Sequence, residues 1–216
     1  MVNLKELDAA CRNRTEEWAL HDTVLYDMCR NYPGHSSRER VNAKVGIIAR
    51  AYATGIERKI RSDGGQGSAL LQLTTFINRK HKAVDRAIGP LLEIEELTID
   101  SLRKIVRAHG TLVALLAELT RDGQASRSFC SKYLHFHCPI VPVYDQVVAS
   151  AIPSLMGWRP KLDVLIPPVS PSDRAYAVYA MRFLALYNDI RRSRPALSVK
   201  ELDFYLLNER ARRKVR

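Results

Sequence analysis

Two charged residues, Lys132 and Asp145, have the types and spacing that best suit chemistry in this 216-residue chain. Lys132 falls in a short predicted helix that ends before Cys138-Pro139, because a residue that precedes proline avoids the helical conformation. The extended stretch IVPVY follows, and Asp145 begins the next predicted helix. Such a chain can fold the aspartate back beside the lysine, and the positive potential of a helix N-terminus favours an ionised carboxylate. Spacing alone leaves an alternative open, in which Asp145 only caps its helix and Lys132 is a surface charge.

Other chemistries lack a complete set of residues. His135, His137 and Cys138 are close in sequence, but helical residues two apart point to different sides, whereas paired metal ligands need a spacing of three or four. We therefore predict structural histidines, no metal site and no cofactor. Cys130 and Ser131 lack the elbow motif that activates a nucleophile for acyl transfer.

Helices must position these residues, because apolar side chains recur every three or four positions along most of the chain. A helix behind the Thr98 cap is open to interruption at Gly110, since glycine inside a helix costs about 1 kcal/mol. Ser198 and Glu201 resemble a capping box at the start of the last helix. We predict a mainly α fold over residues 1–216, as one compact multi-helix domain or as two interleaved lobes with the active-site cleft between them. The predicted helices cover residues 38–61, 68–88, 98 onward, about 131–137, 145–152, 172–192 and 198–208, with an irregular proline-rich loop at 153–171.

The composition is that of an ordinary globular protein, with 46% hydrophobic and 26% charged residues, which excludes wholesale disorder. No run approaches the roughly 20 apolar residues that span a bilayer, and the N-terminal stretch has no apolar signal segment. The four cysteines are widely scattered and are expected to be free thiols. We expect a soluble cytoplasmic protein that has no membrane partner.

The net charge of +11 favours a polyanionic partner, usually nucleic acid. Residues 191–216 hold nine Lys/Arg and three acidic residues, so this basic C-terminal segment supplies much of the excess. It is either a solvated tail or an arm that contacts phosphates.

The pattern SKYLHF…P…PVYDQVV resembles the active-site segment of the helix-hairpin-helix DNA glycosylase superfamily. In the 8-oxoguanine type, a helix-opening lysine is followed by a Pro-Val connector and a catalytic aspartate, which match here at Lys132, Pro142-Val143 and Asp145. The hairpin has only Gly123 where the superfamily has a Gly-hydrophobic-Gly turn, and the Lys–Asp interval is shorter. The whole chain, including AKVGIIARAYATGIER at residues 43–58, is similar to a small bacterial glycosylase group tied to phage defence.

This resemblance implies an enzyme that flips a modified base out of double-stranded DNA and excises it, leaving an abasic site. The expected target is a hypermodified cytosine of phage DNA, such as glucosylated hydroxymethylcytosine, and no obligatory protein partner is inferred. Asp145 would stabilise positive charge on the sugar and orient water. Lys132 would either attack C1′, adding strand cleavage, or hold a phosphate or a sugar hydroxyl. The candidate base-contacting residues are Tyr52, Arg58 and Tyr144, and the candidate DNA-contacting residues are Arg127, Ser128, Ser131, Arg191, Arg192, Arg212 and Arg213.

Two rival functions need no catalysis. The same charge would serve a helical DNA- or RNA-binding protein in which Asp145 is a simple cap. A protein-interaction module of a defence operon would have no basic cleft. The discriminating feature is whether Asp145 lies in a cleft beside Lys132 or at an ordinary helix start.

Overall fold

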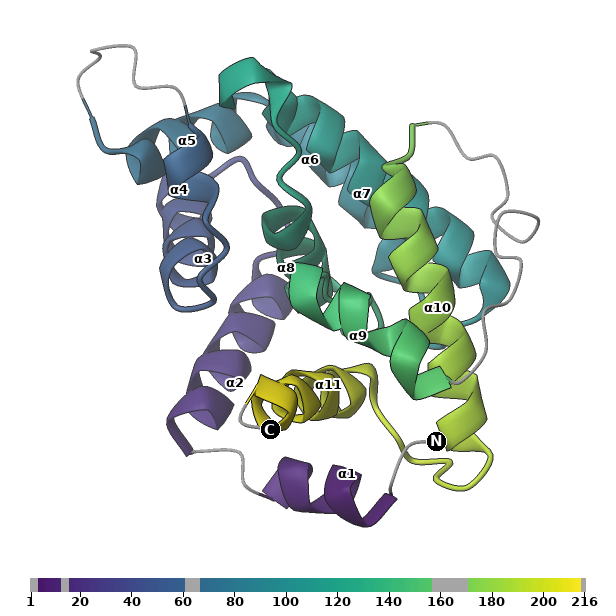
Figure 1. Cartoon of the computed structure of the whole chain (residues 1–216). Coiled ribbons are helices and arrows are strands. Elements are labelled where there is room, and N and C mark those ends of the chain that lie inside the picture. The colour runs from purple at the N-terminus through teal and green to yellow at the C-terminus, as the bar shows by residue number, and fades with distance from the viewer. Residues whose placement is uncertain (1–3, 13–15, 61–66, 157–170, 215–216) are drawn as a thin grey trace.

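The computed structural model describes residues 4–12, 16–60, 67–156 and 171–214. The described chain is mainly α-helical and contains no β-strand, as predicted (Figure 1). None of its described helices is long and apolar enough to cross a membrane. The α-helices are α1 (Leu4–Arg12), α2 (Glu16–Asn31), α3 (Arg38–Arg50), α4 (Ile56–Lys59), α5 (Ala69–Arg79), α6 (His81–Ile88), α7 (Ile99–Ala117), α8 (Arg127–His137), α9 (Gln146–Met156), α10 (Arg174–Arg191) and α11 (Val199–Lys214), with short 3-10 helices η1 (Gly89–Leu91) and η2 (Arg121–Gly123).

The helix predicted over residues 38–61 is two helices, α3 and α4, separated by a turn at residues 51–55. Ala53 and Gly55 both adopt positive φ angles, of 46° and 67°, which stop the helix. The apolar stripe continues across this break, so periodicity does not reveal it. The predicted helix over 68–88 is likewise divided, into α5 and α6 at Lys80.

Helix α7 runs through Gly110 without the interruption that glycine permits there. Thr98 and Ser101 form a reciprocal capping box at its start. A Cβ atom on Gly110 would lie 2.5 Å from the carbonyl oxygen of Pro171 and 2.6 Å from the Cα of Ser172. Glycine at this position therefore lets the chain that enters α10 approach α7 closely.

A tight turn at residues 118–126, which contains η2, joins α7 to α8, and the two helices pack together. Asp122 and Gly123 adopt positive φ angles, of 52° and 64°. Lys59 donates a hydrogen bond of 2.6 Å to the carbonyl of Ala125, which fastens the turn to α4. Helix α8 begins at Arg127, earlier than predicted, and ends before Cys138, as predicted.

The C-terminal segment is part of the folded domain as far as it is described. Ser198 and Glu201 form the predicted capping box, with Ser198 N–Glu201 Oε2 and Glu201 N–Ser198 Oγ distances of 2.7 and 3.1 Å. Leu202, Tyr205 and Leu206 are buried, and α11 lies between α1 and α9, packing on both (Figure 1). The start of the basic segment is therefore a core helix, not a solvated tail.

One hydrophobic cluster unites the helices. Within it, α3 packs on α5, α2 on α8, and α7 on both α8 and α10. Helix α8 carries most of its residues into this core, including Tyr133, Leu134 and Phe136. Lys132 belongs to the same helix and is only half-buried, so it faces the edge of the core.

Candidate active site

A cavity of about 360 Å³ lies between α2, α8, α11 and the turn after α3. Both Lys132 and Asp145 line it. Asp145 therefore lies in a cleft beside Lys132 and is more than an ordinary helix start. The complete lining is Asp22, Ala51, Tyr52, Ala53, Lys132, Phe136, Val143, Asp145, Lys200, Asp203, Phe204 and Leu207.

Asp145 is also the residue that caps α9. Its Oδ1 accepts hydrogen bonds from the backbone N–H groups of Val147 and Val148, at 2.8 and 3.2 Å. These bonds fix the carboxylate at a helix N-terminus, where a negative charge is favourable. Capping and a place in the cavity are therefore compatible, because the same bonds hold the carboxylate on the wall.

Lys132 reaches across the cavity from α8. Its ammonium group donates a hydrogen bond of 2.8 Å to the backbone carbonyl of Tyr52, in the turn after α3. Burial lowers the pKa of Lys132, while the negative charges of Asp203 and Asp145 act in the opposite direction. The amine thus experiences the charge of two carboxylates and is partly withdrawn from water.

Asp203 comes from α11 and is the most isolated charged group in the cavity. It is only 3% exposed, and its Oδ1 atom is buried without a hydrogen-bond partner among the described residues. Burial raises the pKa of Asp203 to about 6; Lys200 and Lys132 oppose the rise and Asp145 and Asp22 add to it. A carboxyl group in this setting can hold a proton near neutral pH.

Asp22, Tyr52 and Lys200 form a connected group on the remaining wall. The Tyr52 hydroxyl donates to Asp22, and the Lys200 ammonium lies 3.6 Å from the same carboxylate oxygen. Lys200 also lies 5.5 Å from the ring centroid of Tyr52 and 5.6 Å from that of Phe136. These contacts hold two aromatic rings and a cation at the cavity surface.

The three residues expected to contact a base are in different environments. Tyr52 lines the cavity. Tyr144 does not line it: its hydroxyl donates to Gln146 at 2.7 Å and its ring packs edge-on against Tyr179. Arg58 is exposed on α4 and is not among the residues that line the cavity.

The hairpin residues expected to contact DNA make contacts within the protein. Arg127 forms two hydrogen bonds to Asp173, at 2.7 and 2.8 Å. Ser131 is buried; its hydroxyl donates to the carbonyl of Ser128 and accepts from the backbone N–H of Tyr144. Ser131 therefore ties α8 to the connector that delivers Asp145.

The basic residues predicted near the C-terminus are spread along the fold. Arg191 is half-buried near Glu96, with a separation of 3.8 Å, and Arg192 is exposed beside Asp189. The side chains of Arg212 and Arg213 lie outside the described residues.

Sequence reasoning missed Asp22, Lys200 and Asp203. In α11, Lys200, Asp203, Phe204 and Leu207 follow one another at steps of three, one and three, which puts them on one helix face. That spacing was a signal for a shared surface. Asp22 gave no signal, because it is one polar residue among several in its helix.

The histidines of α8 are buried and bonded to protein atoms. His135 makes hydrogen bonds of 2.5 Å to the Tyr26 hydroxyl and 2.8 Å to the carbonyl of Val141, and burial lowers its pKa to about 3. His137 lies 3.2 Å from Lys44 Nζ and 2.8 Å from the carbonyl of Tyr133. Both rings therefore serve the packing of α8, in agreement with the structural role predicted for them.

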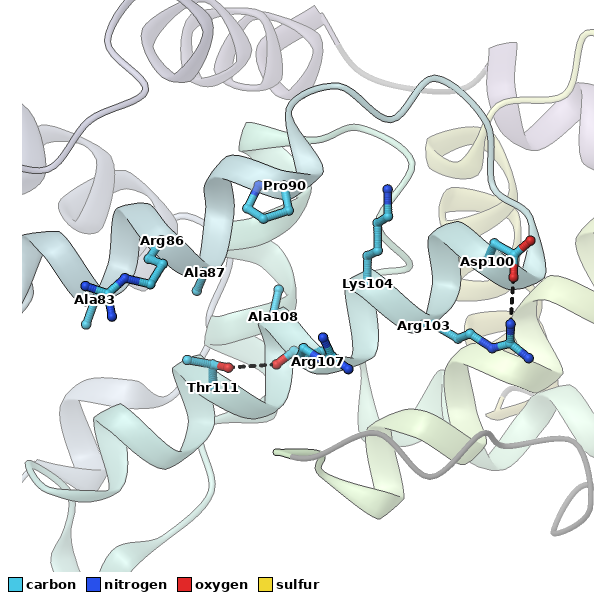
Figure 2. A pocket seen from close by; sticks show the side chains of 10 residues that line it. All are labelled: Ala83, Arg86, Ala87, Pro90, Asp100, Arg103, Lys104, Arg107, Ala108 and Thr111. Carbon is cyan, nitrogen blue, oxygen red and sulfur yellow. Dashed lines mark hydrogen bonds and ion pairs between the residues drawn. The ribbon is translucent and has the colours of Figure 1, made fainter.

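A second and larger cavity, of about 860 Å³, lies between α6 and α7. Figure 2 shows its basic side chains, with Arg86 on α6, Arg103 and Lys104 next to each other on α7, and Arg107 one turn further along α7. Arg103 pairs with Asp100 at 2.7 Å. The floor is made of small apolar residues, including Ala87, Pro90 and Ala108. We call this the α6–α7 groove.

Comparisons of the chain with known protein families, with curated proteins and with solved structures find no match. We therefore infer the function from the two cavities. The first combines three carboxylates, two amines and aromatic rings, a set able to transfer protons and to stabilise a developing positive charge.

Proposed function

We propose that the protein is a DNA glycosylase that hydrolyses the N-glycosidic bond of a modified base, in defence against phage. The observation that carries this proposal is the common cavity of Lys132 and Asp145, with the buried Asp203 beside them. Lys132 and Asp145 of the glycosylase-like segment, which are 13 positions apart in sequence, thus line the same cavity.

The hydrolysis would begin with breakage of the bond between C1′ and the base nitrogen, whose electron pair leaves with the base. Positive charge develops on the sugar, and the Asp145 carboxylate stabilises it. Water adds to C1′ and loses a proton, and the departing base gains one, so that the products are the abasic sugar and the neutral free base. The bonds from Val147 and Val148 aim the carboxylate during this step.

The size and lining of the cavity suit a flipped base. Its volume of about 360 Å³ falls within the range of small-ligand sites. Tyr52, Phe136 and Phe204 offer apolar faces, and flipped bases are read by stacking and hydrogen bonds. The additional carboxylates and amines would suit a base with a hydroxyl-rich substituent, which supports a hypermodified cytosine as the target.

The arrangement of α7, the 118–126 turn and α8 supports a helix-hairpin-helix element. The turn bends sharply at Asp122 and Gly123. Helix α8 then carries Lys132 to the cavity and the connector carries Asp145. In this scheme Lys132 either forms a Schiff base with C1′ or holds the DNA backbone near the cavity mouth.

Base release from defined duplexes tests the proposal. Purified protein is incubated with duplexes that contain cytosine, hydroxymethylcytosine, glucosylated hydroxymethylcytosine, uracil or 8-oxoguanine at one position. The free base is measured by mass spectrometry, and abasic sites are revealed with alkali. We expect release of glucosylated hydroxymethylcytosine. Strand breaks should appear without alkali if Lys132 attacks C1′, and only after alkali if it does not. No release from any duplex would contradict the proposal.

The α6–α7 groove favours a second candidate function, nucleic-acid binding without catalysis. Arg86, Lys104 and Arg107 are exposed, and none of them forms an ion pair with an acidic side chain among the described residues. Cations at adjacent turns of α7 repel one another mildly, so a phosphate backbone would relieve them. Tight, salt-sensitive binding together with a lack of base release would favour this function.

A further inference from the structure

We infer that Asp203 is the proton donor to the departing base, acting from the α11 wall of the cavity that Asp145 also lines. This inference rests on the proposed glycosylase function. It adds a residue from the C-terminal helix to the catalytic pair, Lys132 and Asp145, that the sequence predicted.

The first support is the isolation of the Asp203 carboxyl group. The side chain lines the cavity and is 3% exposed, and its Oδ1 oxygen is buried with no hydrogen-bond partner in the part of the chain that the structure describes. A buried carboxylate oxygen without a donor is costly, whereas a protonated carboxyl group avoids most of that cost. The geometry therefore favours the acid form and leaves its proton available to a ligand in the cavity.

The second support is the contrast with the other two carboxylates. Asp145 accepts two backbone hydrogen bonds at the start of α9. Asp22 accepts from the Tyr52 hydroxyl and lies 3.6 Å from the Lys200 ammonium. Asp145 and Asp22 therefore have hydrogen-bond donors or a cation beside them, which stabilise the ionised carboxylate. Carboxyl groups whose environments differ in this way commonly divide the roles of acid and of charge stabiliser.

The charged surroundings of Asp203 come from every wall. Lys200 on its own helix and Lys132 on α8 favour its anionic form, while Asp145 before α9 and Asp22 on α2 oppose it. The negative charge of Asp203 also acts on Tyr179 of α10, where it adds to the effect of burial in raising the pKa of the phenol. Burial outweighs the two lysines and raises the pKa of Asp203 to about 6.

The proton would move in the bond-breaking step. As the C1′–N bond breaks and its electron pair goes to the base, the Asp203 proton passes to a nitrogen or oxygen of that base, which leaves neutral. Asp203 becomes a carboxylate. Water adds to C1′, and the proton that it loses restores the acid form of Asp203, directly or through solvent.

The test compares single-turnover base release at several pH values in wild type, Asp203→Asn and Asp203→Glu. We expect the wild-type rate to fall as the pH rises through about 6. Asp203→Asn should slow release by about 100- to 10,000-fold and remove this fall, and Asp203→Glu should restore part of both. Asp189→Asn, an exposed aspartate on α10, is the matched control and should leave the rate and the profile unchanged.

A second substrate separates a proton donor from a structural role. A base that carries an electron-withdrawing substituent needs less protonation to leave, so it should be released by Asp203→Asn with a much smaller deficit. A deficit of the same size for both bases, or a mutant that keeps the wild-type pH profile, overturns the role of Asp203 while the glycosylase function stands. A wild-type protein that releases no base overturns both.

Discussion

The Lys132 ammonium donates a hydrogen bond of 2.8 Å to the backbone carbonyl of Tyr52, a residue 80 positions earlier in the chain. This contact joins α8 to the turn after α3 and closes one side of the candidate cavity. It exists only because α3 ends at Arg50, since a carbonyl within a continuing helix would bond to its own helix. The end of α3 therefore leaves available the carbonyl group that holds the Lys132 ammonium in place.

The stability of the protein should depend on pH through Asp203. Its pKa is about 6 in the folded protein and about 3.9 in an unfolded chain. Because the folded pKa is the higher of the two, the contribution of this group is fully present below pH 4 and is lost as the pH rises through about 6. Asp203→Asn should therefore gain stability relative to wild type at pH 8 by about 2–3 kcal/mol, compared with their difference at pH 4.

Urea unfolding at both pH values measures this difference. Asp189→Asn, whose carboxylate is exposed, provides the comparison and should show no such change. If the difference in unfolding free energy between Asp203→Asn and wild type is the same at pH 4 and pH 8, Asp203 ionises as an aspartate does in water.

The two lysines of the cavity should each tune Asp203. Both act to lower the pKa of Asp203, so Lys200→Met and Lys132→Met should each move it further upward. The effect should be greater for Lys200, whose influence is the larger. Carbon-13 NMR titration of labelled aspartate carboxyl groups reports this value directly. Lys80→Met, on the surface near Glu118, is the control and should leave the pKa of Asp203 unchanged. An unchanged pKa in all three variants would contradict the influence of Lys200 and Lys132 on Asp203.

The α6–α7 groove should contribute a phosphate contact to DNA binding. Arg107→Gln is expected to weaken binding to short duplexes and to reduce the slope of log affinity against log salt by about 1. Lys82→Gln removes the same charge from the same region but lies outside the lining, and should have a smaller effect. Equal slopes for both variants would assign the effect to net charge and remove the groove from the interface.

Gly110→Ala should destabilise the fold although alanine is the better helix former. The added Cβ would meet the Pro171 carbonyl oxygen at 2.5 Å, and overpacking of this kind costs about 1–3 kcal/mol. At Gly46 in α3, the nearest atom to an added Cβ is Leu70 Cδ2 at 3.8 Å, so Gly46→Ala should be neutral or stabilising by up to about 1 kcal/mol. Thermal or urea unfolding distinguishes the two, and a stabilised Gly110→Ala would contradict the close approach.

Local signals predicted the helices well where capping and proline act alone. The Ser198–Glu201 box and the end of α8 before Cys138 depend on neighbouring residues, so the sequence contains them. Only part of the break after Arg50 is signalled by the sequence. Gly55 is a residue type that favours a positive φ, but Ala53 adopts one as well, in a turn whose Tyr52 carbonyl accepts a hydrogen bond from Lys132 of α8. Tertiary contacts override helix propensity there.

The candidate site was partly predictable for a similar reason. Lys132 and Asp145 belong to one segment whose pattern is readable along the chain. Asp203 belongs to a helix that reads as part of a basic C-terminal segment, and its burial arises only when α11 packs between α1 and α9. The chemistry of that carboxyl group is thus a property of the assembled fold.

The most direct test of the glycosylase proposal is base release by wild type and by Asp145→Asn. Asparagine caps helices about as well as aspartate, so the variant should fold and bind DNA like wild type. We expect wild type to release a modified cytosine and Asp145→Asn to lose at least about 100-fold in rate at unchanged DNA affinity. Release by Asp145→Asn at the wild-type rate, or no release by wild type under any condition that allows DNA binding, would contradict the proposal.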